Sequence, residues 1–179
     1  MKMKRVLFLF CVFVFAGWFF WCCDPPQSFS KIPEIHFKSL EFKYITTGLG
    51  TDLMPTLIFS FIDGDGDIGV SPQDVDSISR IHYTWYQKLP EGYVQHQFQT
   101  GKTTQSSAIP YEEVMNKDDA NNKTLKGTIK ITFDAPTNIQ GIDTMRIEFF
   151  IVDRARNKSN VEFTPDFSIL NPPIELPTK

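Results

Sequence analysis

The stretch that decides the fold is TLIFSFIDGDGDIG at residues 56–69, in which an apolar run ends abruptly in alternating aspartates and glycines. Residues 56–62 are apolar at nearly every position, which is typical of a strand buried on both faces. Pro55 precedes this run and is expected to mark its start, because proline is tolerated at the first residue of a strand. The sequence therefore predicts a central strand that ends in an acidic loop.

Six further segments have the periodicity or composition of strands, and they span residues 35–44, 80–89, 93–100, 125–134, 144–153 and 160–170. A one-residue slip in the alternation at Ser39 predicts a β-bulge, and Pro90-Glu91-Gly92 predicts a hairpin turn. No convincing amphipathic helix interrupts the series. These seven strands predict an all-β, immunoglobulin-like two-sheet β-sandwich over residues 35–170, with a barrel as the alternative.

The N-terminus has the pattern of an export signal. The basic sequence MKMKR precedes an uncharged apolar run over residues 6–21, and Cys22 and Cys23 follow at once. One interpretation is a bacterial lipoprotein signal over residues 1–23, in which one of the cysteines receives the lipid, although Trp21 stands where a small residue is usual. The other is an uncleaved signal anchor, whose length is at the short end for a bilayer core of ~30 Å. Both predict a membrane-anchored protein of the cell envelope whose residues 24–179 face outward.

Proline-rich segments flank the predicted domain, and they predict a tether at residues 24–34 and a tail at residues 171–179. All 21 acidic residues lie after Cys23, together with 15 of the 18 basic residues, which leaves a formal charge of −6 on this part of the chain. This charge argues against nucleic acid as a partner, because phosphates need a basic patch. No cysteine follows Cys23, so we expect neither a disulfide nor thiol chemistry in the domain.

The sequence has no motif that predicts catalysis. Its three histidines are widely spaced, and neither an HExxH nor a GxSxG pattern occurs. No GK[ST] follows the glycines of DGDGD, and the neighbouring carboxylates would repel phosphate. The aspartates are adjacent in one loop and do not flank a predicted cleft, which disfavours a glycosidase. We therefore expect a binding protein and not an enzyme.

The acidic loop places five aspartates within fourteen positions. Two such charges ~4 Å apart repel by ~1 kcal/mol in water, and a divalent cation would replace this repulsion with coordination. Asp63, Asp65 and Asp67 resemble positions one, three and five of an EF-hand calcium loop, with Asp74 at position twelve. However, Ile68 stands where that loop has glycine, and the flanking segments are strands, so a true EF-hand is not expected and a non-helical Ca²⁺ loop is one of two interpretations. The alternative is a tight acidic turn whose carboxylates accept hydrogen bonds from their own backbone amides.

A second polar connection, DRARNKSN at residues 153–160, joins the last two predicted strands. In an immunoglobulin-like sandwich the loops after the second and sixth strands lie at the same pole, so this connection is expected beside the acidic loop. Asp153 and Asn157 are then candidates to complete the cation shell. Arg154 and Arg156 are candidates to neutralise the aspartates without a metal. The sequence leaves both outcomes open.

Three stretches of the chain, together with the leader, are similar to a known group of proteins. The stretches are FSFIDGDGDIG, AIPYEEVMNKDDANNKTLKGTIKI and FFIVDRARNKSN. They resemble uncharacterised lipoproteins of Bacteroidetes whose outer domain is immunoglobulin-like. The resemblance implies this fold and a location in the cell envelope, but no activity.

Two kinds of partner are expected for such a domain. The first is another envelope protein, toward which this chain would act as an accessory or adhesion module. The alternative is a glycan, bound by a carbohydrate-binding lipoprotein that serves glycan uptake. Tyr83 and Trp85 fall on one face of segment 80–89, where they form either part of the core or an aromatic platform for a ligand.

Overall fold

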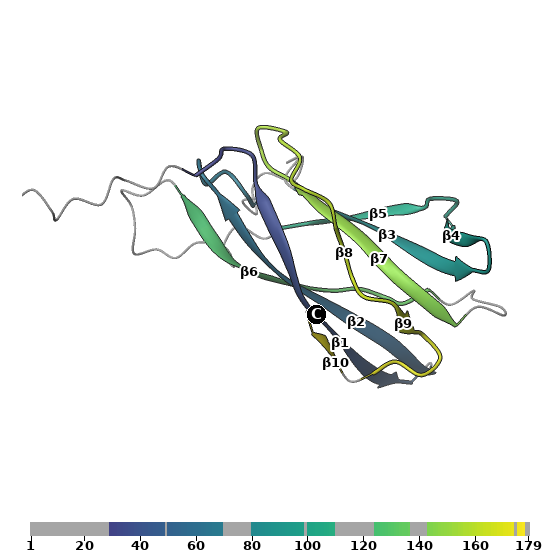
Figure 1. The fold of residues 1–179 in the computed structure, drawn as a ribbon. Coiled ribbons are helices and arrows are strands. Elements are labelled where there is room, and N and C mark those ends of the chain that lie inside the picture. Colours follow the sequence, from purple (N-terminus) through teal and green to yellow (C-terminus); the bar gives the residue numbers. More distant parts are fainter. Residues whose placement is uncertain are drawn as a thin grey trace, which may run out of the picture.

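The computed structural model describes residues 29–48, 50–69, 80–98, 100–109, 124–136, 143–173 and 175–177. All the regular secondary structure in these ranges consists of β-strands, which confirms the all-β prediction for this part of the chain (Figure 1). The leader, with Cys22 and Cys23, lies outside the described residues. Within them, no helix is long and apolar enough to cross a membrane.

The strands form two antiparallel sheets in a β-sandwich, and the sheets do not join into a single barrel within the described ranges. The first sheet has the order β10-β1-β2-β6, with the bounds β10 (Glu175–Pro177), β1 (Glu34–Thr47), β2 (Gly50–Asp63) and β6 (Leu125–Thr132). The second has the order β4-β3-β7-β8, with β5 paired to β3 and β9 paired to β7. Its bounds are β3 (Arg80–Leu89), β4 (Gly92–Gln95), β5 (Thr104–Ala108), β7 (Thr144–Val152), β8 (Glu162–Phe163) and β9 (Phe167–Ser168).

Strands β1 and β2 form one long antiparallel hairpin, whose last pair is Thr47 and Gly50. The register shifts between Phe37 and Ser39, which confirms the predicted bulge. Both strands are longer than predicted, because the residues nearest the turn are exposed and have no apolar alternation to indicate pairing. The prediction that Pro55 marks the start of the second strand is wrong, since Pro55 lies inside β2. Proline is tolerated there because the ladder to β6 ends at the next residue, Thr56.

Two other predicted strands differ from the structure. The hairpin turn at Pro90-Glu91-Gly92 is confirmed, but the strand after it ends at Gln95, because the chain then bends into a turn in which Phe98 N donates to Lys102 O. The segment 160–170 forms only the short strands β8 and β9 on the edge of β7. Strand β5 was not predicted, because TQSSA has no apolar alternation.

The two sheets pack face to face around one hydrophobic core. The ring of Phe149 on β7 lies 5.2 Å from that of Phe59 and 6.4 Å from that of Phe37, both on the opposite sheet. Strand β7 alternates buried and half-buried residues, as the period of two predicts. Fully buried apolar side chains come from both sheets and from the loops between them: Ile35, Leu40, Leu57, Phe59, Ile68, Ile81, Trp85, Ile109, Met145, Ile147, Phe149 and Ile151.

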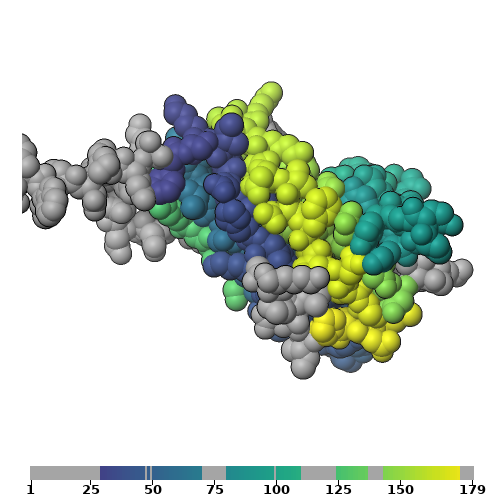
Figure 2. Space-filling view, in the orientation of Figure 1, coloured from purple at the N-terminus to yellow at the C-terminus, as the bar shows by residue number. Residues whose placement is uncertain are grey.

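The connection after β7 also joins the two sheets at one side of the sandwich. Asn160 accepts a hydrogen bond from Ile35 N at 2.8 Å and donates one to Ile35 O at 2.8 Å. In the space-filling view, the purple residues of β1 lie beside the yellow-green residues of this connection (Figure 2). This pairing fixes the segment around residue 160 against the start of β1, at the same end of the molecule as the acidic loop (Figure 1).

Candidate metal centre

The acidic loop and the loop after β7 lie against each other, although they leave different sheets. Arg154 donates from its backbone N and from Nε to the carbonyl oxygen of Asp67, at 3.3 and 2.9 Å. Ala155 N donates to Asp67 Oδ2 at 2.9 Å. The expected proximity of segments 63–67 and 153–157 is therefore what the structure shows.

Four aspartates form one cluster at this contact. Asp63, Asp65, Asp67 and Asp153 each offer a carboxylate oxygen, and these four atoms lie within 4.8 Å of one another. Asp63, the last residue of β2, and Asp153, the first residue after β7, have no exposed surface, while the other two are half-buried. Carboxylates this close and this poorly hydrated repel strongly unless protons or a cation compensate them.

Backbone amides donate hydrogen bonds to carboxylates of this cluster, but three of the aspartates each have one oxygen without a partner. Asp63 Oδ2 accepts from Asp67 N at 2.8 Å and from Ile68 N at 3.2 Å. The Oδ1 atoms of Asp63, Asp65 and Asp67 are all buried without a hydrogen-bond partner among the described residues. Buried polar atoms normally have a partner, and three such oxygens in one cluster are a donor set that a single cation would satisfy. The arrangement could bind a metal ion.

Asn157 approaches the cluster through Asp153. Its backbone N donates to Asp153 Oδ1 at 2.7 Å, and its Nδ2 donates to Asp153 Oδ2 at 2.8 Å. Both oxygens of Asp153 are therefore oriented by one residue, and each retains a lone pair for a further ligand. Asn157 thus lies where it positions a neighbouring carboxylate, and its role as a direct ligand of the cation stays a prediction. Asp74, the remaining predicted ligand, lies outside the described residues.

The backbone of the two loops has local features that bring the carboxylates together. Gly66 has a φ of 67°, in the left-handed region that glycine adopts most easily, and it separates Asp65 from Asp67. Ile68 is fully buried in the core, so it anchors the far end of the loop. This isoleucine stands where an EF-hand loop has glycine. Its apolar character indicates a packing role, and this signal was available in the sequence.

Burial and mutual repulsion raise the pKa values of two of these carboxyls. Burial is the main cause that raises the pKa of Asp63 from 3.8 to about 6, and the charges of Asp65 and Asp67 add to it, while two backbone hydrogen bonds oppose it. Burial also raises the pKa of Asp67, with contributions from Asp153 and Asp65. Near neutral pH the metal-free cluster therefore keeps charges in an environment that disfavours them.

The two arginines make different contacts with the loops. Arg154 contacts the carbonyl of Asp67 through Nε, and its charge lowers the pKa of Asp67, although less than the other causes raise it. Arg156 is exposed and, within the described part of the chain, forms no ion pair with any of the four aspartates. Its φ of 71° is unusual for a residue with a side chain. These contacts therefore support the prediction that Arg154 compensates the charge of the aspartates, and they give no such support for Arg156.

Comparison with known proteins identifies no relative, because no family model, no curated protein and no solved structure matches the chain. The resemblance to Bacteroidetes lipoproteins stays a prediction.

Proposed function

We propose that this protein is a non-catalytic binding domain anchored at the cell envelope, and that Ca²⁺ bound by its acidic loop organises one pole of the domain. The observation that supports this best is the cluster of buried, unpartnered Oδ1 atoms on Asp63, Asp65 and Asp67. A cation at their meeting point would satisfy three orphaned acceptors at once. It would also compensate the charges of Asp65 and Asp67, which add to the effect of burial in raising the pKa of Asp63.

Calcium fits this donor set better than other common metals. All the candidate ligands are carboxylate oxygens, which hard cations prefer, whereas zinc sites usually contain nitrogen or sulfur. Mg²⁺ needs near-ideal octahedral geometry and gives up its water reluctantly. Ca²⁺ accepts six to eight oxygens in flexible geometry, so backbone carbonyls of the loop and water would complete the shell.

Bound calcium would link two loops that come from opposite sheets. The loop after β2 contributes Asp63, Asp65 and Asp67, and the loop after β7 contributes Asp153. We infer an immunoglobulin-like sandwich from the two antiparallel sheets, and in such a fold the loops at one pole form a binding surface. The proposed role is that of an accessory or adhesion partner of another envelope protein, with membrane attachment through Cys22 or Cys23 or through the apolar leader.

Calorimetric titration of the full chain in detergent, after removal of metals with a chelator, tests calcium binding. We expect saturable binding of Ca²⁺, a raised melting temperature, and a much weaker response to Mg²⁺. Absence of both heat and a melting shift at millimolar Ca²⁺ would refute the calcium proposal and leave Arg154 as the compensating charge.

The partner role has a separate test, which uses cross-linking of the tagged full chain in its own envelope. We expect one recurrent neighbour that is recovered with the wild type in Ca²⁺ and is reduced with Asp63→Asn. Recovery of the tagged chain alone would count against the accessory role, while leaving the calcium site itself unaffected.

A further inference from the structure

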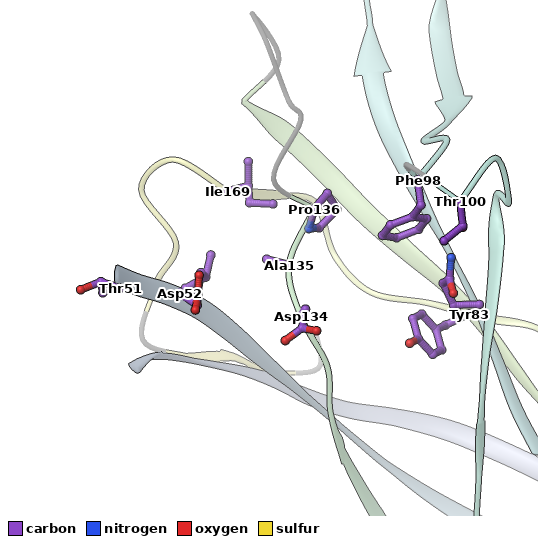
Figure 3. Close-up of a pocket in the computed structure, with 11 residues that line it drawn as sticks. Thr51, Asp52, Tyr83, Phe98, Thr100, Asp134, Ala135, Pro136 and Ile169 are labelled. Atoms are coloured by element: carbon purple, nitrogen blue, oxygen red, sulfur yellow. The ribbon is translucent and has the colours of Figure 1, made fainter. Parts of the chain in front are cut away.

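A second concave site lies away from the acidic pole, on the side of the sandwich where β2 begins. It has a volume of about 650 Å³, within the range typical of small-molecule sites (Figure 3). Its lining comes from the start of β2, from Tyr83 on β3 and Gln105 on β5, from the segment after β6, and from Phe98, Thr100 and Ile169. Leu53, in this lining, lies ten residues before Asp63 on β2, which corresponds to roughly 33 Å along an extended strand.

Two aromatic rings and several apolar groups form part of this pocket. Tyr83 is half-buried, and one face of its ring stacks on Phe133, with a centroid distance of 4.7 Å and an interplanar angle of 15°. Phe98 is also half-buried and packs edge-to-face on His96 at 5.1 Å. Trp85, by contrast, is fully buried in the core, so the pair Tyr83 and Trp85 does not form the exposed platform considered from the sequence.

The polar groups of the pocket are two carboxylates, a primary amide and hydroxyls. Asp52 and Asp134 are exposed, and neither forms an ion pair with any described residue. Figure 3 shows the Tyr83 hydroxyl on the side of its ring that faces Asp134, and the charge of Asp134 contributes to raising the pKa of this hydroxyl, after burial. Gln105 lies directly opposite Tyr83 on β5. No lysine or arginine is among the described lining residues, which disfavours an anionic ligand.

We propose that this pocket binds a neutral saccharide. A sugar ring presents apolar C–H groups on its faces and hydroxyls around its edge, which matches aromatic rings beside a set of hydrogen-bonding groups. A carboxylate oxygen accepts from a hydroxyl, and an amide or a hydroxyl group both donates and accepts. An ammonium ligand would use the two carboxylates and the acceptor oxygens of the amide and hydroxyls, but it would leave their N–H and O–H donors without a role. This inference goes beyond the calcium proposal and does not depend on it.

Saturation-transfer NMR on the full chain in detergent, with cellobiose, maltose, xylobiose and mannobiose as probes, tests the proposal. We expect binding of at least one sugar at millimolar concentration, weakened roughly tenfold by Phe98→Ala and by Asp134→Asn. Phe163→Ala removes an exposed ring on β8, in the same sheet as Tyr83 but outside the pocket lining, and should leave binding unchanged. Binding should persist in EDTA, so loss of calcium and loss of the sugar site are distinguishable.

Three results would overturn the saccharide proposal. The first is no saturation transfer to any of the four sugars from a chain whose melting curve shows that it is folded. The second is sugar binding that Phe98→Ala and Asp134→Asn do not weaken. The third is salt-sensitive binding of spermidine, abolished by Asp134→Asn, without sugar binding, since this would assign the pocket to an organic cation.

Discussion

The backbone N–H of Gly64 donates a 2.8 Å hydrogen bond to the carbonyl oxygen of Ser30, which ties the acidic loop to the chain just before β1. A Cβ on Gly64 would lie 2.4 Å from the carbonyl oxygens of both Phe29 and Ser30. Lys126 on β6 adds a contact there, with Nζ 3.6 Å from the centroid of the Phe29 ring. These contacts therefore hold the loop that carries the aspartate cluster against the N-terminal end of the domain.

Substitution Gly64→Ala should destabilise the domain by about 1–3 kcal/mol, because the new methyl group meets backbone atoms that have to move. Urea unfolding of the full chain measures this cost, and hydrogen exchange should show faster exchange around residues 29–35. Gly48→Ala is the matched control, since a Cβ there has no atom within 4 Å. Equal stability of the two variants would show that the contact between Gly64 and Ser30 is not maintained in solution.

Substitution Asp63→Asn should stabilise the metal-free protein at pH 7, by up to about 3 kcal/mol, because it removes a buried charge that the fold disfavours. The side-chain carbonyl oxygen of the introduced asparagine can still accept from the amides of the loop. The same variant should lose most of the stabilisation that Ca²⁺ gives the wild type. Thermal unfolding with and without Ca²⁺ measures both effects.

The control for this substitution is Glu91→Gln, which neutralises an exposed carboxylate in the β3–β4 turn. It should change neither the metal-free stability nor the response to Ca²⁺. If Asp63→Asn is instead destabilising without metal and responds normally to Ca²⁺, Asp63 is a structural residue of an acidic turn and not a ligand.

The stability of the metal-free protein should fall as the pH rises from about 4 to above 6. The folded pKa of Asp63 is raised from 3.8 to about 6, so the stability it contributes is present below the unfolded pKa and is lost as pH rises through the folded pKa. Asp67 acts in the same direction. Saturating Ca²⁺ should flatten or reverse this dependence, because protons compete with the cation for the same oxygens. Unfolding curves between pH 4 and pH 8 give the free energy of unfolding at each pH, once with EDTA and once with Ca²⁺. If this free energy changed with pH in the same way under both conditions, the result would contradict the role of the cluster.

Substitution Asn157→Ala should lower the affinity for Ca²⁺ by about tenfold or more, because a residue that orients a metal ligand affects binding at this scale. The backbone hydrogen bond from residue 157 to Asp153 Oδ1 remains, so the domain should stay folded with a loss of about 1 kcal/mol. Calorimetry on the full chain measures the affinity. An unchanged affinity would mean that Asp153 needs no support from Asn157.

Substitution Arg156→Asn distinguishes backbone strain from charge compensation. Asparagine tolerates the left-handed conformation better than arginine, so we expect stability to be unchanged or raised by up to about 1 kcal/mol. If Arg156 neutralised the aspartates, its removal would destabilise the metal-free protein. Denaturant unfolding at low ionic strength, where such an effect is largest, separates the two outcomes.

The strands that could be predicted are those whose side chains alternate against the core. Alternation in segments 35–44 and 144–153 predicted β1 and β7, and the slip at Ser39 predicted the bulge. Strand β5 and the threonine-rich turn of the first hairpin could not be predicted, because backbone hydrogen bonds hold them and their side chains have no apolar pattern. Strand pairing through backbone hydrogen bonds alone depends on the neighbouring strand, so the local sequence does not predict it.

The acidic cluster was accessible to sequence reasoning because Asp63, Asp65 and Asp67 are close in sequence and the expected topology placed Asp153 beside them. The role of Asn157 as a partner of Asp153 depends on side-chain direction, which spacing does not define. The pocket at Tyr83 and Phe98 was not predicted, because its lining comes from segments that are far apart along the chain.

The long hairpin of β1 and β2 separates the two ends of the domain. The chain enters β1 next to the aspartate cluster, whereas the pocket begins roughly 30 Å away, near the turn of the hairpin. In a chain tethered to a bilayer before residue 29, the hairpin would act as a rigid spacer that presents the pocket beyond the lipid headgroups. Calcium bound by the cluster would then lie at the end of the domain nearest the membrane.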